Sequence, residues 1–253
     1  MTRIIMHGAS GYMGKVISEL CELDQDASVV AGVDVNTDAD RSYPIYKTLD
    51  EVKEEADVII DFSHFSAVDG MLDFCEKTKM PVVLCTTGLS EEQLANVNKL
   101  TETSAVLKSA NMSLGINTLM ELLKKAALVF APAGFDIEVV EKHHNRKLDA
   151  PSGTALALAD SVNEALDNEY EYVYDRSTRR EKRPQKEIGI SAVRAGTIVG
   201  EHDVIFAGTD EVITFSHTAY SRSVFAKGAI EAAKFLKGKD AGLYDMADVI
   251  AAK

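Results

Sequence analysis

The chain of 253 residues contains no tryptophan, only five prolines and only three cysteines. Cys21, Cys75 and Cys85 are widely spaced and form no CxxC pair, and an odd number of cysteines argues against a disulfide framework. Free thiols are the normal state of cysteine in a reducing cytoplasm. We therefore expect a cytoplasmic protein that folds around a hydrophobic core.

Basic residues and long apolar runs are also scarce. The 27 Lys and Arg residues are outnumbered by 40 Asp and Glu residues, which gives a formal net charge of −13. An acidic chain gains no general attraction to the phosphate backbone of nucleic acid. No apolar run approaches the roughly 20 residues that span a bilayer, and His7, Gly8 and Gly11 interrupt the apolar N-terminus, unlike that of a signal peptide. These absences argue against nucleic-acid and membrane partners.

Hydrophobic residues nevertheless make up 46% of the chain, and their spacing changes along it. Up to residue 130, short and uninterrupted apolar runs alternate with segments of helical spacing. The apolar runs cover residues 3–7, 28–34, 57–61, 81–85 and 104–108, and the helical segments cover residues 15–23, 67–77, 90–100 and 114–130. Strands without polar alternation, separated by helices, predict an α/β fold with a parallel sheet covered on both faces.

The pattern is different beyond residue 134. Segments typical of strands now follow one another with few helices between them. These strands cover residues 135–141, 187–193, 202–206 and 211–217, and helical spacing occurs at residues 154–166 and 224–236. This arrangement predicts a second, α+β domain with a mixed or antiparallel sheet. The last helix then returns the chain to the first domain.

A glycine-rich segment, Gly8-Ala-Ser-Gly11-Tyr-Met-Gly14, follows the first predicted strand and opens a helix. In a Rossmann-type fold, such glycines permit a tight turn, a close backbone approach to a pyrophosphate and close packing of helix on strand. The helix start supplies N–H groups to the phosphates. Asp34 ends the next strand, where a carboxylate accepts from ribose hydroxyls. The alternative is a glycine-rich turn that binds no ligand.

The residues around Asp34 bear on the choice of cofactor. Asp34 is followed by Val35 and Asn36, without an adjacent basic residue. A carboxylate disfavours the 2′-phosphate of NADPH, so we predict that NADH is preferred and that NADPH is the second cofactor. Arg41 and Lys47 lie nearby in the sequence and act against this preference if their charges reach the ribose.

Two further segments follow predicted parallel strands. They are Thr86-Thr87-Gly88 and Ser109-Ala110-Asn111-Met112. Open α/β sheets bind ligands at the carboxyl ends of their strands. Each segment alone is a common turn sequence, but together with the glycine loop they are candidates to line the nicotinamide half of the cofactor.

The segment from Glu141 to Thr154 carries two adjacent histidines, a lysine and a predicted helix start. Histidine exchanges protons near neutral pH, and His143 and His144 are followed closely by Lys147. The helix start at Gly153 exposes N–H groups that can bind a carboxylate. The segment thus combines proton transfer with anion binding. An ordinary polar loop is the alternative, and a zinc site lacks further ligands, so no metal is expected.

A basic run lies between residues 176 and 186 of this acidic chain. It contains Arg176, Arg179, Arg180, Lys182, Arg183 and Lys186. Such a run usually forms a solvated, mobile loop. A role in attracting an anionic substrate is the other interpretation.

With these segments in view, the chain resembles the 4-hydroxy-tetrahydrodipicolinate reductases, also named dihydrodipicolinate reductases. The most specific match is His143-His144-Asn-Arg-Lys147-Leu-Asp-Ala-Pro-Ser-Gly153-Thr154-Ala. The other motifs follow in the family's order along nearly the whole chain: the glycine loop, Asp61-Phe-Ser-His, Thr86-Thr87-Gly88, Ala110-Asn111-Met-Ser, the segment from Arg194 to His202, and Ser221-Arg222.

The resemblance implies the domain organisation and the activity. A Rossmann-type dinucleotide-binding domain would comprise residues 1–114 and 222–253. An inserted α+β domain of residues 115–221, which contains the mixed sheet, would bind the substrate and build a homotetramer. The enzyme would use NAD(P)H to reduce hydroxy-tetrahydrodipicolinate, a small dicarboxylate, to tetrahydrodipicolinate with loss of water, in the diaminopimelate route to lysine.

The resemblance also implies the roles of individual residues. His143 would be the catalytic acid/base and Lys147 the proton donor, and His144, Gly153 and Thr154 would bind the substrate carboxylates. The cofactor would be lined by Gly8, Ala9, Ser10, Gly11, Tyr12, Met13, Asp34, Cys85, Thr86, Thr87, Ser109, Ala110, Asn111 and Met112.

Three positions depart from the family's pattern. Cys85 stands where many relatives have glycine, His64 replaces a basic residue of some members, and Val35 replaces an arginine of others. The last two put a preference for NADPH in doubt. Three alternatives remain open from the sequence. They are a dehydrogenase for another amino or imino acid, a non-catalytic sensor of the NADH/NAD⁺ ratio, which would have no use for the histidine segment, and a relative whose role in the lysine pathway has been lost or replaced.

Overall fold

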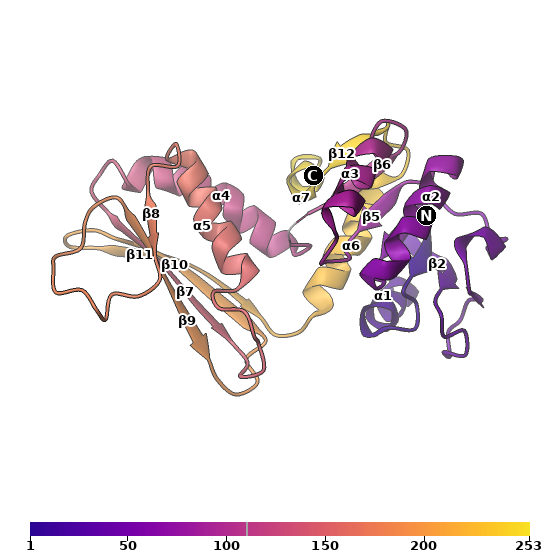
Figure 1. Cartoon of the computed structure of the whole chain (residues 1–253), viewed down its shortest axis with the longest axis horizontal. Helices are drawn as coiled ribbons and strands as arrows, with labels where there is room; N and C mark the ends of the chain where they lie inside the picture. Colours follow the sequence, from indigo (N-terminus) through magenta and orange to yellow (C-terminus); the bar gives the residue numbers. More distant parts are fainter. Residues whose placement is uncertain (110) are drawn as a thin grey trace. The chain divides into compact units, whose positions relative to one another are not determined.

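The computed structural model describes residues 1–109 and 111–253, and the chain divides into two compact units. The first unit consists of Met1–Leu114 and Ser223–Lys253, and the second of Gly115–Arg222. The two ends of the chain therefore belong to the same unit (Figure 1). The expected boundary placed residue 222 with the first unit, whereas the structure places Arg222 in the second.

The first unit is built on a seven-stranded sheet in which every paired strand is parallel. The strands are β1 (Thr2–His7), β2 (Ala27–Val33), β3 (Ile45–Tyr46), β4 (Val58–Asp61), β5 (Val82–Leu84), β6 (Ala105–Lys108) and β12 (Gly242–Tyr244). Their order is β3-β2-β1-β4-β5-β6-β12. The order reverses between β1 and β4, and doubly wound sheets bind ligands outside the strand ends at such a reversal.

Helices cover both faces of this sheet, as the uninterrupted apolar runs predict. The helices are α1 (Tyr12–Glu22), α2 (Val68–Thr78), α3 (Glu91–Leu100), α6 (Ser223–Leu236) and α7 (Met246–Ala251), with short 3-10 turns at Leu49–Glu51 and Phe65–Ala67. Ile4 and Met6 of β1 pack in the core that includes α1, α6 and α7. Ile5, between them, packs in the core that includes α2 and α3. Successive side chains of a strand face opposite ways, so a strand between two helical layers is apolar throughout.

The second unit contains a five-stranded mixed sheet of order β11-β10-β7-β9-β8. The strands are β7 (Asp136–His143), β8 (Glu171–Val173), β9 (Glu187–Arg194), β10 (Gly200–Ala207) and β11 (Val212–Ala219), and the helices are α4 (Leu114–Phe130) and α5 (Gly153–Ala165). Strands β7, β8 and β9 are parallel, and β10 is antiparallel to β7 and β11. The predicted α/β fold with a second, mixed sheet is confirmed.

One face of this sheet is buried beneath the two helices. In β7 every second residue is buried, and Ile137 and Val139 pack with Leu123 of α4 and Leu158 of α5. The same alternation brings Glu141 and His143 onto the buried face. The strand thus carries an apolar core at its start and two polar side chains at its carboxyl end.

The basic run does not behave as the solvated loop that its composition suggests. Arg176 and Arg179 donate to the buried carboxylate of Glu187. Arg183 donates to Glu138 at 3.0 Å and to Asp136 at 2.8 Å. Several of the arginines therefore attach this segment to the sheet.

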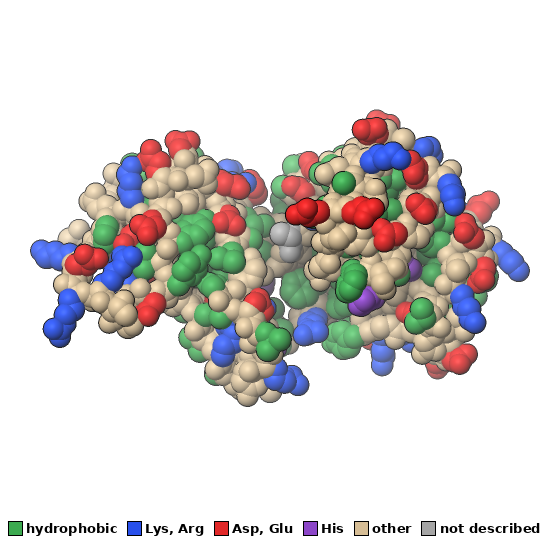
Figure 2. Space-filling view, viewed as in Figure 1, with side chains coloured by type: hydrophobic (Ala, Val, Ile, Leu, Met, Phe, Trp, Pro, Cys, Tyr) green, Lys and Arg blue, Asp and Glu red, His purple; other side chains and the backbone are tan. Residues whose placement is uncertain are grey.

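The surface of each unit carries charges of both signs (Figure 2). Acidic and basic side chains are interspersed over the visible face of each unit (Figure 2). Among residues 1–109 and 111–253, no helix has both the length and the apolar character that a bilayer crossing requires.

Candidate active site

The glycine loop of the first unit has the geometry that a dinucleotide requires. Gly8 has a φ of +85°, and a Cβ there would lie 2.6 Å from the Phe62 carbonyl oxygen. A Cβ on Gly14 would lie 2.4 Å from the Gly8 carbonyl oxygen. Because α1 begins at Tyr12, directly after Gly11, the helix N-terminus faces this loop. The close packing and the helix start are those that cradle a pyrophosphate, so these residues fit NAD(P)H.

Asp34 and Arg41 hold opposite ends of one peptide group in this loop. The Ser10 N–H donates to Asp34 Oδ2 at 3.0 Å, and the Asn36 N–H donates to Asp34 Oδ1 at 3.1 Å. Arg41 Nη2 donates to the Ala9 carbonyl oxygen at 3.0 Å. The carbonyl of Ala9 and the N–H of Ser10 belong to the same peptide. A carboxylate and a guanidinium therefore both lie next to the predicted ribose site.

The loops after β4 and β5 are joined at the same edge of the sheet. Thr86 Oγ1 donates to the Ser63 carbonyl oxygen at 3.0 Å, and the Cys85 N–H donates to the Asp61 carbonyl oxygen at 3.0 Å. The buried Asp61 carboxylate lies 2.8 Å from His7 Nδ1. Sequence reasoning gave His7 and Asp61 no role of their own, although each ends a strand next to the reversal of strand order.

The remaining predicted cofactor residues differ in exposure. Tyr12 and Thr87 are exposed, whereas Asn111 and Met112 are buried. Met112 belongs to the hydrophobic core of the first unit, so only its backbone is suited to touch a cofactor. Burial raises the pKa of the Cys85 thiol well above its ordinary value. Ala110 lies outside the described residues.

In the second unit, His143 is the last residue of β7 and is buried. The sequence had placed it in a polar loop. Its Nδ1 lies 2.6 Å from Glu141 Oε2, and Glu141 has no exposed surface. The two residues are two apart on a strand, so their side chains point to the same face.

Glu141 accepts four hydrogen bonds from three residues. Arg194 donates to both carboxylate oxygens, each at 2.7 Å, and the Ser152 N–H donates to Oε1 at 2.9 Å. Burial alone would raise the pKa of Glu141, but the hydrogen bonds from Arg194, His143 and Ser152 outweigh it and hold this pKa below its ordinary value. The bidentate arginine pair keeps Glu141 ionised in a buried position.

Two more histidines continue this row across the sheet. His202 of β10 pairs in register with Glu141 on one side and with His217 of β11 on the other. His202 Nε2 lies 3.2 Å from Ser152 Oγ, and its ring centroid lies 5.2 Å from that of His143. Burial, followed by the charge of His143, lowers the pKa of His202 to about 4. His202 is therefore neutral at pH 7.

This buried neutral histidine predicts a pH dependence of stability. The pKa of about 4 lies below the ordinary 6.5, so as the pH falls below 6.5 the unfolded chain takes up a proton that the folded chain does not. The free energy of unfolding should fall by up to about 3 kcal/mol between pH 6.5 and pH 4 from this residue. Urea unfolding at both pH values should show a smaller fall for His202→Gln than for wild type. The exposed His64, replaced by Gln, is the control. Equal falls for wild type and His202→Gln would contradict the prediction.

Lys147 and His144 follow His143 in the loop after β7. Lys147 Nζ forms an ion pair with Asp149 at 2.9 Å, and the Asp149 side chain is 58% exposed. Because solvent reaches the Asp149 carboxylate and weakens the pair, the ammonium group is able to exchange this partner for another anion. Burial, followed by the positive charges of Arg146 and His143, lowers the pKa of His144.

The start of α5 adjoins Glu141. Ser152 is the N-cap, and its Oγ accepts from the Ala155 N–H at 3.2 Å. Gly153 is exposed, and a Cβ added to it would meet nothing within 4 Å. An anion is thus able to approach the helix start at Gly153, and the partial positive charge of a helix N-terminus attracts it. Thr154 is the next residue of this helix.

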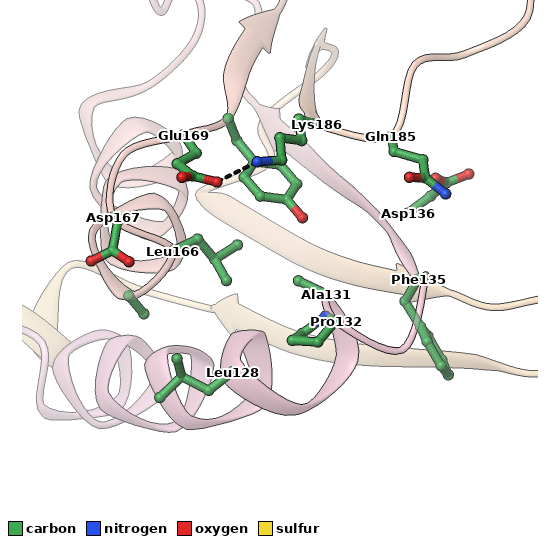
Figure 3. A pocket seen from close by; sticks show the side chains of 13 residues that line it. Leu128, Ala131, Pro132, Phe135, Asp136, Leu166, Asp167, Glu169, Gln185 and Lys186 are labelled. Atoms are coloured by element: carbon green, nitrogen blue, oxygen red, sulfur yellow. Dashed lines mark hydrogen bonds and ion pairs between the residues drawn. The ribbon is translucent and has the colours of Figure 1, made fainter.

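Other sites are less suitable for the expected chemistry. Within the described ranges, no group of three or more His, Cys, Asp or Glu side chains could hold a metal ion. A cavity of about 480 Å³ in the second unit is lined by Leu128, Phe135, Leu166, Tyr170 and Lys186, among others (Figure 3). It contains none of the predicted catalytic or substrate-binding residues, and it lies beyond the end of α5 that is opposite to Ser152.

Sequence reasoning missed part of the site in the second unit. Glu141, Ser152, Arg194 and His202 appeared in its motifs but received no role. The signal that could have identified Glu141 was its spacing of two from His143, directly at the end of the predicted strand of residues 135–141. Arg194 lies 53 positions from Glu141 in the chain, and only the pairing of β7 with β9 brings it there.

Comparison with known proteins relates both units to the same family. The model of the dihydrodipicolinate reductase N-terminus matches residues 2–112, and that of the dihydrodipicolinate reductase C-terminus matches residues 115–250. A 4-hydroxy-tetrahydrodipicolinate reductase of Caldanaerobacter subterraneus subsp. tengcongensis is 56% identical over 99% of this chain and 98% of its own length. The enzyme of the same name from Clostridium botulinum is 47% identical, with the same coverage. The structure of dipicolinate-bound dihydrodipicolinate reductase from Paenisporosarcina sp. TG-14 has the same fold, with a TM-score of 0.80 at 24% identity over 97% of each chain.

Proposed function

The chain belongs to the dihydrodipicolinate reductase family, and on this premise we propose how its residues reduce 4-hydroxy-tetrahydrodipicolinate with NAD(P)H. The products are tetrahydrodipicolinate, NAD(P)⁺ and water, in the diaminopimelate route to lysine. The observation that carries the assignment of residues is the 2.6 Å contact between His143 and the buried Glu141, beside the start of α5.

His143 and Lys147 provide the proton chemistry. NAD(P)H, when bound, supplies the hydride. After loss of water the substrate is a conjugated imine, and its ring nitrogen gains electron density as the ring is reduced. Because Glu141 occupies Nδ1 of His143, the other ring nitrogen is the one that exchanges a proton with the substrate. Lys147 adds positive charge and a proton at the same side, once its exposed pair with Asp149 is exchanged for the substrate.

The substrate carboxylates are held by the start of α5 and the neighbouring cations. Gly153 and Thr154 offer the first N–H groups of the helix, and His144 lies next to His143 in the chain. Two carboxylates on opposite sides of the ring nitrogen require two separated anion sites, and the helix start and the loop after β7 supply them. Fixing both carboxylates orients the ring towards the proton donor.

The first unit holds the cofactor. Residues 8–13 cradle the pyrophosphate, Asp34 accepts from the ribose, and residues 85–87 and 109–112 line the nicotinamide half. The positive φ of Gly8 and the tight packing of Gly14 support this placement, because a Cβ at either position would collide with neighbouring backbone atoms.

NADH is preferred over NADPH. Asp34 already faces the predicted ribose site, and a carboxylate there repels a 2′-phosphate. Arg41 lies at the other end of the same peptide and lessens this repulsion. Wild type should therefore show a higher kcat/KM with NADH, and Arg41→Ala should lower kcat/KM for NADPH more than for NADH. Steady-state rates with each cofactor measure both effects.

Lys47 provides the matched control for Arg41. It is also basic and nearby in sequence, but it is exposed, so Lys47→Ala should leave the ratio of the two kcat/KM values unchanged. A clear preference of wild type for NADPH would contradict the role given to Asp34. Equal losses with both cofactors in Arg41→Ala would mean that Arg41 only shapes the loop.

The enzyme forms a homotetramer through the sheet of the second unit. Both helices of that unit pack on the same face of the sheet as Ile137 and Val139. The other face carries Val140, Val193 and Ile205, and in the described part of the chain no helix packs over it. Light scattering of the intact protein distinguishes a tetramer from a monomer of 27.5 kDa.

We expect the protein in the cytoplasm. The free state of all three cysteines is consistent with a reducing compartment.

A coupled assay tests the proposed reaction. Hydroxy-tetrahydrodipicolinate is generated immediately before use. The absorbance of NADH is then followed after addition of the protein. We expect consumption of NADH that depends on both the substrate and the protein. No consumption with this substrate, together with turnover of another amino or imino acid, would assign the chain to the rival dehydrogenase.

A further inference from the structure

Glu141 is neither a predicted catalytic residue nor a predicted binding residue, but its carboxylate contacts both His143 and the start of α5. We propose that Glu141 is a positioning residue that fixes the proton-carrying nitrogen of His143 and, through the same carboxylate, the start of the helix that holds the substrate. This inference rests on the proposed function, and it names the residue that makes the histidine and the helix start act as one site.

The contacts of Glu141 divide between its two oxygens. Oε2 accepts from His143 Nδ1 at 2.6 Å and from Arg194 Nη1 at 2.7 Å. Oε1 accepts from the Ser152 N–H at 2.9 Å and from Arg194 Nη2 at 2.7 Å. The carboxylate has no exposed surface, so water does not compete for these positions. Four hydrogen bonds use the acceptor capacity of an ionised carboxylate in full.

The first consequence concerns the tautomer of His143. An ionised carboxylate only accepts hydrogen bonds, so Nδ1 of His143 must carry a hydrogen. Nε2 is then the nitrogen that gains and loses a proton during the reaction. Nε2 lies close to Gly200, the first residue of β10, where an added Cβ would be 3.1 Å from this nitrogen. A glycine at this position leaves space beside the ring.

The second consequence concerns α5. The Ser152 N–H that Glu141 binds belongs to the N-cap, and Ser152 Oγ accepts from the Ala155 N–H. Glu141 thus holds the cap, and the cap determines the direction of the N–H groups at Gly153 and Thr154. A shift of this carboxylate would move the histidine and the carboxylate-binding helix start together.

The charged and titratable groups around Glu141 come from several elements. Arg194 lies on β9, His143 on β7 and His202 on β10, and Lys147 and Asp149 follow in the loop. Arg194 is the permanent cation among them. Without the negative charge of Glu141, Arg194 would be an unpaired cation beside His143, whereas Asp149 is already paired with Lys147. The protonated form of His143 would therefore become less favourable.

The test is the replacement Glu141→Gln, which keeps the shape and removes the charge. We expect kcat to fall by roughly 10²- to 10⁴-fold, since loss of the carboxylate partner of a catalytic histidine leaves it in the wrong tautomer. KM for the substrate should rise, because the helix start is released, while KM for NADH should stay near that of wild type. The alkaline limb of the pH profile of kcat/KM should move to lower pH by about one unit or more.

A spectroscopic readout separates positioning from a purely structural role. The ¹⁵N chemical shifts of the His143 ring should show hydrogen on Nδ1 in wild type and a mixture of tautomers in Glu141→Gln. Glu201→Gln is the matched control, because Glu201 lies on the same sheet but pairs with Lys142 in a half-exposed position. It should keep the wild-type kcat, pH profile and ring shifts.

A second variant covers the case in which Arg194, left without its partner, prevents folding. The double replacement Glu141→Gln/Arg194→Gln removes both buried charges and should show the same change of tautomer and pH profile. Wild-type kcat, pH profile and ring shifts in either folded variant would overturn the proposal. If wild type does not reduce the substrate, the proposed function fails, whereas the tautomer measured without substrate still decides the role of Glu141.

Discussion

Replacement of His143 by glutamine should lower kcat by about 10²- to 10⁴-fold, which is the usual contribution of a general acid or base. Glutamine retains a hydrogen bond to Glu141 but cannot donate a proton at neutral pH. Lys147→Ala should also lower kcat strongly, because it removes a proton donor and a positive charge. Dissociation constants for NADH, from fluorescence titration, should change little in both variants, since the predicted cofactor residues belong to the first unit.

Lys142→Met is the control for these variants. Lys142 precedes His143 on β7, but it points to the other face of the sheet and pairs with Glu201 and Asp203. It should retain the wild-type kcat. Wild-type kcat in both His143→Gln and Lys147→Ala would remove the two residues from the mechanism.

Replacement of Arg194 by methionine should lower the free energy of unfolding by about 3 to 5 kcal/mol, because it leaves a buried carboxylate without its ionic partner. Arg194 is the bidentate partner of Glu141, whose side chain has no exposed surface. Urea unfolding followed by circular dichroism measures the loss. Lys142→Met, which breaks a half-exposed pair, should cost less than about 1 kcal/mol.

The effect of Arg194→Met should depend on pH in a defined direction. The pKa of Glu141 in the folded wild type is below its ordinary value. The stabilisation from this ionised group is therefore complete above the pKa of the unfolded chain and is lost as the pH falls through the folded pKa. The difference between wild type and variant should shrink towards acid pH. A difference that stays constant as the pH falls below the folded pKa of Glu141 would show that Arg194 acts through packing alone.

Long apolar patterns predicted most of the fold, and short elements escaped prediction. The helix expected at residues 114–130 is α4, Leu114–Phe130, and the apolar runs match β1, β2, β4, β5 and β6 to within about two residues at each end. The strands β3 (Ile45–Tyr46), β8 (Glu171–Val173) and β12 (Gly242–Tyr244) are too short to show a period, and each lies at an edge of its sheet. Pairing with the neighbouring strand places each of them in its sheet, and their own residues carry no pattern that predicts a strand.

Tertiary contacts explain where boundaries were wrong. Helix α1 begins at Tyr12, three residues before the expected start. Glycine is a poor helix former, yet Gly14 lies inside the helix because only a residue without Cβ fits against the Gly8 carbonyl. The requirement for close packing decides this position, and helix propensity does not.

In the second unit, residue types were easier to predict than their partners. His143, Lys147 and Gly153 stood out as a group that combines proton transfer and anion binding. The position of His143 on β7 was missed because the predicted strand ended at residue 141, although the buried positions Ile137, Val139, Glu141 and His143 keep a strict period of two. Arg194 binds Glu141, and Arg176 and Arg183 of the basic run bind Glu138, and these partners are distant in sequence. The composition of the basic run alone suggested a solvated loop.

The most direct test of the account follows the transferred hydrogen. The protein is incubated with freshly generated hydroxy-tetrahydrodipicolinate and NADH deuterated at the transferred position, and the product is analysed by mass spectrometry. We predict tetrahydrodipicolinate that carries a single deuterium, formed at a far lower rate by His143→Gln. Unlabelled product, or no product while other imino acids become labelled, would contradict the central claim.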